Sequence, residues 1–209
     1  MPKPQLHVSD HPLVQDKLSR LRDRRTRPEE FRRLMAEVGG LIGCEVLKGV
    51  RTRRTTVRTP LRTAPAVVVA QPLTFVAVLR AGLGLTPGLL ALAPGAALGH
   101  IGLYRDEKTL QPVRYSVRLP EGLAGHFVVL CDPMLATGGS AAESIGILKS
   151  AGARTISLLT LLASRPGVAR VHRDHPDVPI HTAVVDATLN ERGYIVPGLG
   201  DAGDRLFGT

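Results

Sequence analysis

The spacing of apolar side chains changes about a third of the way along the chain. In the first third they recur at helical spacing, which predicts one helix over 11–22 and a second that begins with Pro28 in its first turn and continues through Ile42. Residues 51–70 combine Thr, Val and Arg with two prolines, a pattern that predicts a hairpin or arm. The sequence contains no repeat and no low-complexity linker between these segments.

From Leu73 onward, short apolar runs alternate with helix-like segments. Strands are predicted over 74–79, 98–104, 127–131, 155–162 and 180–185, and helices over 85–92, 140–150 and 167–172. Near-continuous apolar strands that alternate with helices are typical of a parallel sheet covered on both faces. We therefore expect an α/β fold with a central, mostly parallel sheet flanked by helices, and ligands beyond the carboxyl ends of its strands.

Composition narrows the class of protein. The chain has 209 residues, 44% hydrophobic and 22% charged, which indicates a globular protein and favours one domain over 1–209. Two cysteines, Cys44 and Cys131, are too few for a disulfide framework or a four-cysteine zinc site, and Cys131 is expected to be structural. Because no secretory signal and no apolar run of ~18 residues is seen, we expect a cytoplasmic protein without a membrane span.

The net charge of +9 comes from two basic segments. Residues 17–33 mix basic with acidic side chains, whereas the second segment has no acid: Lys48, Arg51, Arg53, Arg54, Arg58 and Arg62. Such segments are either solvated basic faces or surfaces for RNA, nucleotide phosphate or an acidic neighbouring subunit. With no Trp and 3% aromatic residues, stacking platforms for single-stranded nucleic acid are scarce, so an RNA partner is not expected.

The segment 127–140 carries the strongest chemical signal. A buried apolar strand ends at Asp132, and a short loop leads to a helix that begins with Gly138, Gly139 and Ser140. Small residues let backbone N–H groups approach a phosphate, and the helix N-terminus adds partial positive charge. The hydroxyls of Thr137 and Ser140 can donate, and Asp132 can accept from sugar hydroxyls. The alternative is a turn with a serine cap and no ligand.

This loop resembles the ribose-phosphate loop of the type I phosphoribosyltransferases, which bind 5-phosphoribosyl 1-diphosphate (PRPP). Most of that superfamily has two adjacent acids before the loop, whereas Cys131-Asp132-Pro133 is similar to the uracil phosphoribosyltransferase family. Three more segments resemble that family: a diphosphate-binding loop at 79–84, a second phosphate-binding arginine and mobile excursion at 102–112, and a uracil-binding signature at 189–205. One departure is that 113–116 holds a single aromatic residue, Tyr115, where the family usually has two.

The resemblance implies that uracil and PRPP react to give UMP and diphosphate. The implied PRPP-binding residues are Arg80, Arg105, Asp132, Pro133, Met134, Leu135, Ala136, Thr137, Gly138, Gly139, Ser140 and Asp201. Of these, the residues assigned to charge stabilisation are Arg80, Arg105 and Asp132. The implied uracil-binding positions are Ile195, Gly200, Asp201 and Ala202, and of these Ile195, Gly200 and Ala202 act through the backbone.

The resemblance also implies a cofactor, an assembly and an effector. Mg²⁺ would bridge diphosphate and ribose oxygens without a direct protein ligand, and Asp201 is the candidate contact to its hydration shell. A homodimer or higher homo-oligomer is expected, with residues 51–69 as a candidate arm, and GTP is a candidate effector. Within the single domain, helices and arm occupy 1–70, the PRPP-binding core 71–185 and a base-binding hood 186–209.

Three other functions are alternatives for this sequence. A regulator with this fold could use its basic face to bind RNA in response to UMP, but the signature at 189–205 resembles the salvage enzyme. A purine salvage enzyme would require two adjacent acids before the loop, and Cys131-Asp132-Pro133 has only one. The pattern Gly198-x-Gly200-x-x-Gly203 matches a dinucleotide fingerprint, yet that fingerprint needs a helix within a βαβ unit and an acid about 20 residues on, so we expect no such site. A metal site at His172 and His175 is not expected either.

Overall fold

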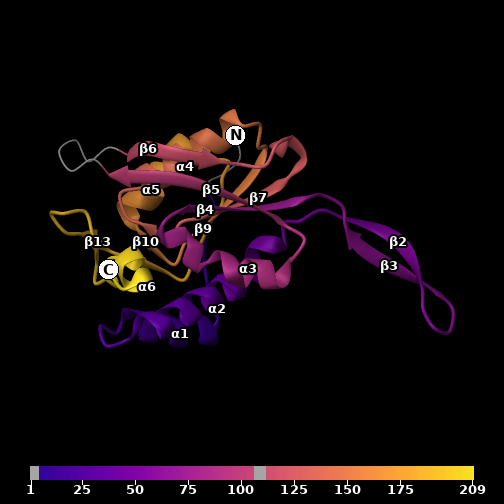
Figure 1. Cartoon of the computed structure of the whole chain (residues 1–209), viewed down its shortest axis with the longest axis horizontal. Helices are drawn as coiled ribbons and strands as arrows, with labels where there is room; N and C mark the ends of the chain where they lie inside the picture. The colour runs from indigo at the N-terminus through magenta and orange to yellow at the C-terminus, as the bar shows by residue number, and fades with distance from the viewer. Residues whose placement is uncertain (1–4, 106–111) are drawn as a thin grey trace.

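A seven-stranded sheet forms the centre of the protein in the computed structural model, which describes residues 5–105 and 112–209 (Figure 1). The strands follow the order β1-β11-β9-β7-β4-β5-β6, and β6 is antiparallel to β5 whereas the other neighbouring pairs are parallel. The strands are β1 (Leu6–Val8), β4 (Leu73–Leu79), β5 (Ala97–Arg105), β6 (Pro112–Arg118), β7 (Phe127–Cys131), β9 (Thr155–Leu159) and β11 (Ile180–Thr182). The predicted α/β fold with a mostly parallel sheet is confirmed.

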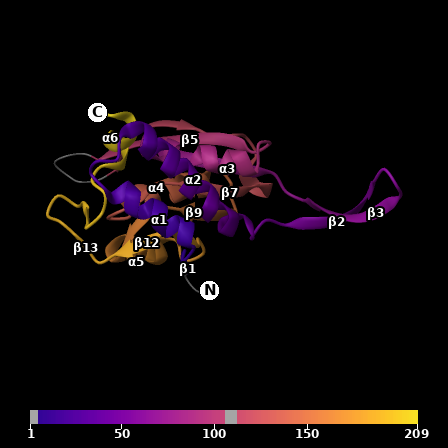
Figure 2. The same ribbon diagram turned by 90° about the horizontal axis from the view of Figure 1, so that it is seen from below.

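Helices cover both faces of this sheet, as the two ribbon views show (Figures 1 and 2). One face carries α1 (Pro12–Arg22), α2 (Pro28–Leu47), α3 (Thr86–Leu92) and α6 (Ala202–Phe207). The other carries α4 (Gly139–Ser150) and α5 (Arg165–Asp174). Two short 3-10 helices lie at Ala81–Gly84 and Leu123–Gly125. The strands between the two layers are buried on both sides, which explains their unbroken apolar sequence.

The first two helices form where the apolar pattern predicts them. Proline occupies the first turn of each, where no backbone N–H is needed. The ring of His11 caps α1 by accepting from the amide of Leu13 at 3.1 Å, and α2 carries Glu29 and Glu30 in its first turn, where the helix dipole favours negative charge. Their apolar faces join one core cluster with β4 and the C-terminal segment, so the N-terminal helices also support the end of the chain.

Two of the predicted strands are interrupted, and this shapes the site. The apolar run 155–162 ends as β9 and resumes as β10 (Leu162–Ser164), and the run 180–185 ends as β11 and resumes as β12 (Val184–Asp186). At each break a threonine hydroxyl bonds to nearby backbone: Thr160 donates to the carbonyl of Leu162 at 3.1 Å, and Thr182 to that of Val184 at 3.0 Å. Together with β8 (Met134–Leu135), β10 and β12 form a separate parallel sheet, which we call the small sheet.

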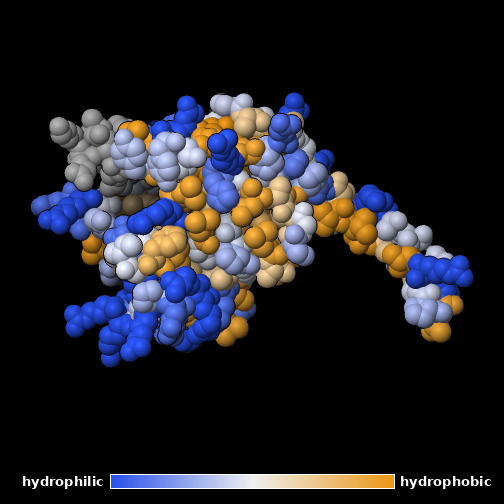
Figure 3. Space-filling view, in the orientation of Figure 1, coloured by the Kyte–Doolittle hydropathy of each residue, from blue (hydrophilic) through white to orange (hydrophobic). Residues whose placement is uncertain are grey.

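The hairpin predicted over 51–70 is confirmed. It consists of β2 (Thr52–Arg58) and β3 (Thr63–Val69), which pair antiparallel and project from the body of the molecule (Figures 1 and 2). We call this hairpin the β2–β3 arm. Figure 3 shows apolar and hydrophilic residues side by side along it. Its exposed apolar side chains are Val57, Leu61, Val67 and Val69, and Leu61 is 95% exposed.

Several elements differ from the sequence-based expectations. Strands β1 and β6 were not predicted, and α5 begins at Arg165 rather than at 167. A further pair of short strands, β13 (Thr188–Leu189) and β14 (Ile195–Val196), precedes the six-residue helix α6. The pattern that ends at Gly203 therefore does enter a helix, but this helix belongs to no βαβ unit within the described ranges. No helix among the described residues is long and apolar enough to cross a membrane.

The mixed basic segment 17–33 lies on α1 and α2, where ion pairs neutralise much of its charge. Lys17 and Arg33 both contact Glu37, and Arg20 contacts Glu30. The acid-free segment instead lies mainly on the β2–β3 arm, where the side chains of Arg53, Arg54 and Arg58 are exposed. Exposed basic side chains therefore gather on the arm and its base, and also at Arg24, Arg25 and Arg27 in the turn between α1 and α2.

Candidate functional site

The carboxyl ends of three neighbouring strands bring together the residues predicted to bind PRPP and stabilise its charge. Strand β4 lies between β5 and β7, and the three run parallel, so Arg80, Arg105 and Asp132 follow or close strand ends at one edge of the sheet. The peptide bond between Leu79 and Arg80 is cis. The side chain of Arg105 and the predicted mobile excursion over 106–111 lie outside the described residues. Backbone topology thus gathers the predicted groups where ligands bind in open α/β sheets.

Residues 132–140, which the sequence predicts to bind a phosphate and which we call the phosphate loop, lead into the twelve-residue helix α4. Gly138 caps this helix with φ of +77°, and a Cβ there would lie 2.8 Å from the carbonyl oxygen of Gly167. The amides of residues 137–140 have no hydrogen-bond partner within the described part of the chain, and neither have the hydroxyls of Thr137 and Ser140. Four amides and two hydroxyls can therefore donate hydrogen bonds to one phosphate group, and the positive end of the helix dipole favours its negative charge.

The small sheet holds the other side of the phosphate loop. The carbonyl oxygen of Pro133 accepts from the amide of Leu162 at 3.0 Å, and that of Ala136 accepts from the hydroxyl of Ser164 at 2.5 Å. Ser164 in turn caps α5 by accepting from the amide of Gly167. Because these carbonyls are bound from behind, the loop is fixed before any ligand arrives. Met134 and Leu135, predicted ligand contacts, form β8, and the buried side chain of Leu135 leaves only its backbone for such a contact.

Asp132 stands at the start of the loop as a partly buried carboxylate. Among the described residues, the carboxylate accepts one hydrogen bond, from the amide of Met134 at 3.4 Å, and no cation pairs with it. Loss of hydration therefore raises the pKa of Asp132 to about 6. Burial raises the pKa of the neighbouring thiol of Cys131 even further from its ordinary value, so Cys131 is uncharged and packs as a core residue.

The predicted uracil-binding segment forms a tight turn between β14 and α6. Gly198 has φ of +56°, and a Cβ there would lie 2.1 Å from the carbonyl oxygen of Ile195. The side chains of Ile195 and Ala202 are buried, so these residues can offer only backbone groups to a ligand. Gly200 and Asp201 are exposed, and one oxygen of Asp201 caps α6 by accepting from the amide of residue 204 at 2.9 Å.

The end of the chain meets the loop that follows β4. A guanidinium nitrogen of Arg80 lies 3.3 Å from the carboxylate of Asp204, and the same guanidinium lies 5.3 Å from the ring centre of Phe207. Both charged side chains are about half exposed (54% and 55%), so this ion pair is weak and can be exchanged for a stronger anion. The structure thus places the predicted diphosphate loop beside the predicted uracil segment.

Arg205 is a residue of the site region whose role the sequence did not indicate. Its guanidinium donates to the carbonyl oxygens of Leu199 at 3.0 Å and Asp23 at 2.6 Å, and lies 4.5 Å from the ring centre of Phe31. It thereby ties the C-terminal segment to α1 and α2. Asp23 and Phe31 stand far from Arg205 along the chain, so no local pattern could have identified them.

Two tyrosines meet at the β5–β6 edge of the sheet. The ring centres of Tyr104 and Tyr115 are 6.4 Å apart and tilted, and a Cβ at Gly102 would lie 2.6 Å from the Tyr115 ring. Tyr115, the single aromatic residue of 113–116, therefore has its aromatic neighbour on the adjacent strand rather than beside it in sequence. Both rings are more than half exposed.

The carboxylates near this edge are the groups to consider for a metal ion. The described residues include no cluster of three or more His, Cys, Asp or Glu side chains that could hold one. Asp132 and Asp201 offer hard oxygen atoms, which suit Mg²⁺ when substrate oxygens and water complete its shell. His175 bonds instead to the carbonyl oxygen of Ala142 at 3.0 Å and to Lys149 at 3.3 Å.

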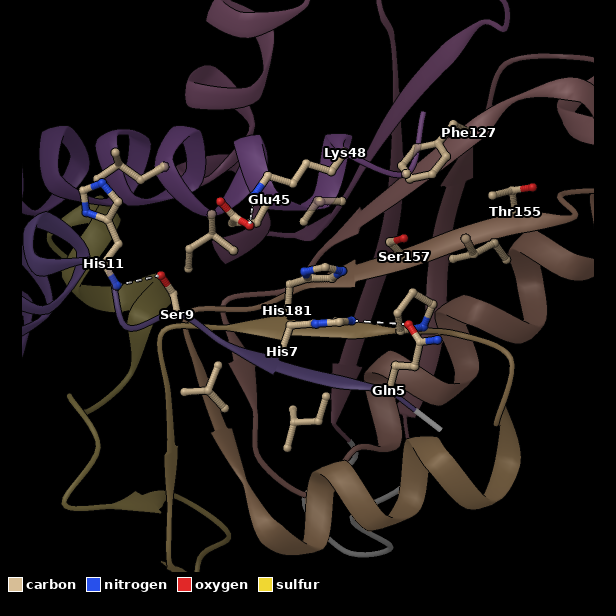
Figure 4. A pocket seen from close by; sticks show the side chains of 18 of the residues that line it. Gln5, His7, Ser9, His11, Glu45, Lys48, Phe127, Thr155, Ser157 and His181 are labelled. Carbon is tan, nitrogen blue, oxygen red and sulfur yellow. Dashed lines mark hydrogen bonds and ion pairs between the residues drawn. The ribbon is translucent and has the colours of Figure 1, made fainter. Parts of the chain in front are cut away.

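A cavity of about 1080 Å³ lies at the opposite edge of the sheet (Figure 4). Phe127 and Thr155, which begin β7 and β9, line it, so it opens at the amino ends of the strands. Within it the rings of His7 and His181 stack with centres 4.5 Å apart, and burial lowers the pKa of His181 to about 4. This cavity is therefore separate from the phosphate loop and from the C-terminal segment.

Comparison with known proteins agrees with this geometry. The profile of the family described as "Uracil phosphoribosyltransferase" matches residues 8–209. Curated relatives named uracil phosphoribosyltransferase include those of Thermoanaerobacter sp. (strain X514), 51% identical over 97% of both chains, and Clostridioides difficile (strain 630), 48% identical over 96% of this chain and 97% of the relative.

Solved structures show the same likeness in three dimensions. The structure of the AQ2163 protein from Aquifex aeolicus superposes with a TM-score of 0.93 at 35% identity, and the match covers 97% of this chain and 98% of that one. An adenine phosphoribosyltransferase from Thermoanaerobacter pseudethanolicus shares the fold, with a TM-score of 0.51 at 16% identity over 73% of this chain and 81% of that one. The chain belongs to the uracil phosphoribosyltransferase family.

Proposed function

We propose that the protein transfers the 5-phosphoribosyl group of PRPP to N1 of uracil. The bond between the anomeric carbon and the diphosphate oxygen breaks, a bond from that carbon to N1 forms, and N1 loses its proton, which gives UMP and diphosphate. One observation carries the proposal: a loop whose amides have no partner among the described residues lies at a helix N-terminus, at the same sheet edge as Arg80, and the side chain of Asp204 from the C-terminal segment contacts Arg80. Family membership supports it.

The phosphate loop is assigned to the ribose end of PRPP. The amides of residues 137–140, with the hydroxyls of Thr137 and Ser140, bind the 5-phosphate, and Asp132 accepts from the ribose hydroxyls. A desolvated carboxylate without a cation is suited to this because charge-assisted hydrogen bonds to it are strong. Holding the sugar at both points orients its anomeric carbon toward the C-terminal segment.

Arg80 and Arg105 are assigned to the diphosphate. As the bond to the anomeric carbon breaks, negative charge grows on the leaving oxygens, and fixed guanidinium groups stabilise that charge. The ion pair of Arg80 with the carboxylate of Asp204 supports this assignment, because an anion already lies beside the guanidinium. PRPP then displaces this carboxylate and frees the C-terminal segment to engage uracil.

Uracil is assigned to the backbone of Ile195, Gly200 and Ala202, with Asp201 beside it. Uracil has two carbonyl oxygens with an N–H between them, a pattern that backbone amides and a carbonyl can match without any side chain. Cytosine carries an amino group where uracil has an acceptor, so it would leave a backbone donor unpaired and be rejected. The exposed position of Gly200, with φ of +82°, supports this role because no side chain covers its main-chain groups.

Mg²⁺ is proposed as the cofactor. The residues that would reach its hydration shell are Asp132 and Asp201, and the bulk of its ligands would come from the substrate and water. When bound, Mg²⁺ would neutralise charge on the diphosphate. The protein's own contribution is then to hold the sugar, the leaving group and the base in line.

A homodimer assembled through the β2–β3 arm is also proposed. The arm exposes Val57, Leu61, Val67 and Val69 although it projects away from its own core, and apolar side chains presented this way suit burial against a second copy. Light scattering on Leu61→Arg and on the intact protein tests this: the variant should be monomeric, and an unchanged dimer would remove the arm from the interface.

Regulation and location complete the proposal. GTP is proposed as an activator on family resemblance, and initial rates with and without GTP decide the matter. A cytoplasmic location is proposed because Cys44 and Cys131 are both free thiols, as is usual in reducing compartments.

The test of function is a product assay. Pure protein is incubated with PRPP, Mg²⁺ and one labelled base: uracil, cytosine, hypoxanthine or orotate. UMP and diphosphate should form in equal amounts from uracil, and cytosine should not react. Nucleotide formation from hypoxanthine alone would contradict the proposal, as would salt-sensitive RNA binding without any UMP.

A further inference from the structure

A closed ring of hydrogen bonds ties α1 to the turn of the uracil segment. The guanidinium of Arg22 grips both carboxylate oxygens of Asp186, with N···O distances of 2.9 and 2.7 Å. The same guanidinium donates to the carbonyl oxygen of Gly198 at 3.0 Å. The amide of Gly198 then donates back to Asp186 at 3.1 Å. Two side chains thus bind both backbone groups of one residue.

This ring is sheltered from water. Asp186 is 7% exposed and the side chain of Arg22 is 22% exposed, in contrast to surface pairs such as Arg25 with Asp23, in which Arg25 is 85% exposed. A bidentate, partly buried pair of this kind holds its geometry far better than a single surface contact. Loss of one partner leaves the other charge buried without compensation, so the ring resists opening.

The ring acts on a turn that transmits displacement directly to the uracil-binding positions. Gly198 lies two residues before Gly200 and packs its backbone against the carbonyl of Ile195. The turn has no room for a Cβ at Gly198, and only Leu199 separates Gly198 from Gly200, so a shift of Gly198 moves the backbone of Gly200 as well. The position of Gly198 therefore determines where the backbone groups assigned to uracil lie.

Asp186 also belongs to the structure that holds the phosphate loop. It ends β12, where it pairs in register with Ser164 of β10, and β10 pairs with β8 through Ala163 and Leu135. The carboxylate that fixes the uracil turn and the backbone that fixes the phosphate loop are therefore parts of one small sheet. The ring determines where the turn stands relative to that loop.

We propose that Arg22 and Asp186 are positioning residues that hold the uracil-binding backbone in line with the sugar bound at the phosphate loop. This inference rests on the proposed function and extends it to two side chains that contact no substrate. It requires the guanidinium fork itself, because one nitrogen of Lys cannot span two carboxylate oxygens and the carbonyl of Gly198 together. The pair should thus matter for uracil and not for PRPP.

The test compares Arg22→Lys and Asp186→Asn with Arg25→Lys, a matched control on the exposed pair. For the first two variants we expect the KM for uracil to rise about tenfold or more while the dissociation constant of PRPP, measured by calorimetry, stays within about twofold. Arg25→Lys should match the wild type. Hydrogen exchange should show faster exchange of the amides of 198–202 in Arg22→Lys and Asp186→Asn alone.

The outcomes separate the two proposals. A wild-type protein that makes no UMP overturns the proposed function, and this inference with it. An active wild type whose Arg22→Lys variant keeps its uracil KM overturns the positioning role alone. A variant in which uracil KM and PRPP affinity worsen together, with a lower melting temperature, assigns the ring to general stability and also overturns it.

Discussion

Replacement of Asp132 with Asn removes the charge of a carboxylate that is partly withdrawn from water and that pairs with no cation among the described residues. Asn keeps the shape and can still accept from the amide of Met134. The folded protein binds the Asp132 proton more tightly than the unfolded chain does, because its pKa is about 6 instead of the ordinary 3.8. The stability that the protonated form contributes is complete below about pH 4 and is lost as the pH rises through about 6.

The size of this effect follows from the two pKa values of Asp132. One pKa unit corresponds to about 1.4 kcal/mol, so the ionised carboxylate costs the fold up to roughly 3 kcal/mol above pH 7. The Asn variant does not pay this cost. Relative to the wild type, its free energy of unfolding should therefore increase by up to about 3 kcal/mol between about pH 4 and pH 8.

Activity should change in the opposite direction. A neutral amide cannot replace the charge-assisted acceptor proposed for the ribose hydroxyls, so kcat/KM for PRPP should fall about 100-fold at pH 8, equivalent to roughly 3 kcal/mol. In the wild type the same constant should decline below about pH 6 as Asp132 takes up its proton, whereas the variant should lack this step.

Urea unfolding of both proteins at about pH 4 and pH 8, at one protein concentration, measures the stability difference. Steady-state rates over the same range measure the activity. A stability difference that is equal at both pH values would refute the reasoning, because it would mean that Asp132 titrates as an ordinary solvated carboxylate. If the variant at pH 8 loses as much free energy of unfolding as it loses in transition-state stabilisation, calculated from kcat/KM, the role of Asp132 is structural.

Three further replacements test separate parts of the site. Gly138→Ala places a Cβ at positive φ and 2.8 Å from the carbonyl of Gly167, so urea unfolding should show a loss of about 1–3 kcal/mol and calorimetry a weaker PRPP complex. Ser140→Ala removes one phosphate donor and should raise the KM for PRPP about tenfold without changing the melting temperature. Asp204→Asn weakens the ion pair that occupies Arg80, so the dissociation constant of PRPP should fall about twofold to fivefold; a higher constant would make Asp204 part of the PRPP site.

The elements that the sequence predicts best are those whose signal is local. Strands β4 and β7 are unbroken apolar runs, and the phosphate loop is a contiguous change from an apolar strand to an acid and then to glycines. The breaks in the runs 155–162 and 180–185 were missed because Thr160 and Thr182 end the strands through hydroxyl hydrogen bonds, which leave no trace in the hydrophobic pattern. Strand β1 is three exposed residues long, and its single apolar alternation, Leu6 and Val8, is too short to predict a strand.

Much of the support around the site could not be predicted, because its partners are far apart in sequence. Arg22 stands in a run of basic residues that looks like a solvated face, and its partner Asp186 is 164 positions away. Arg205 likewise contacts Asp23 across 182 positions. Charge in a sequence indicates that a partner is needed, but only the fold decides which carboxylate supplies it.

The hydrogen bond from Arg22 to Gly198 joins two distant parts of the chain, and this bears on the order in which the protein folds. The strands that carry the phosphate loop lie close together along the chain, whereas the uracil turn is secured by contacts that close almost the full length of the polypeptide. Such distant contacts form slowly, since the chain entropy of closing a long loop must be overcome first. A refolding protein should therefore bind the activated sugar before it can discriminate between pyrimidine bases.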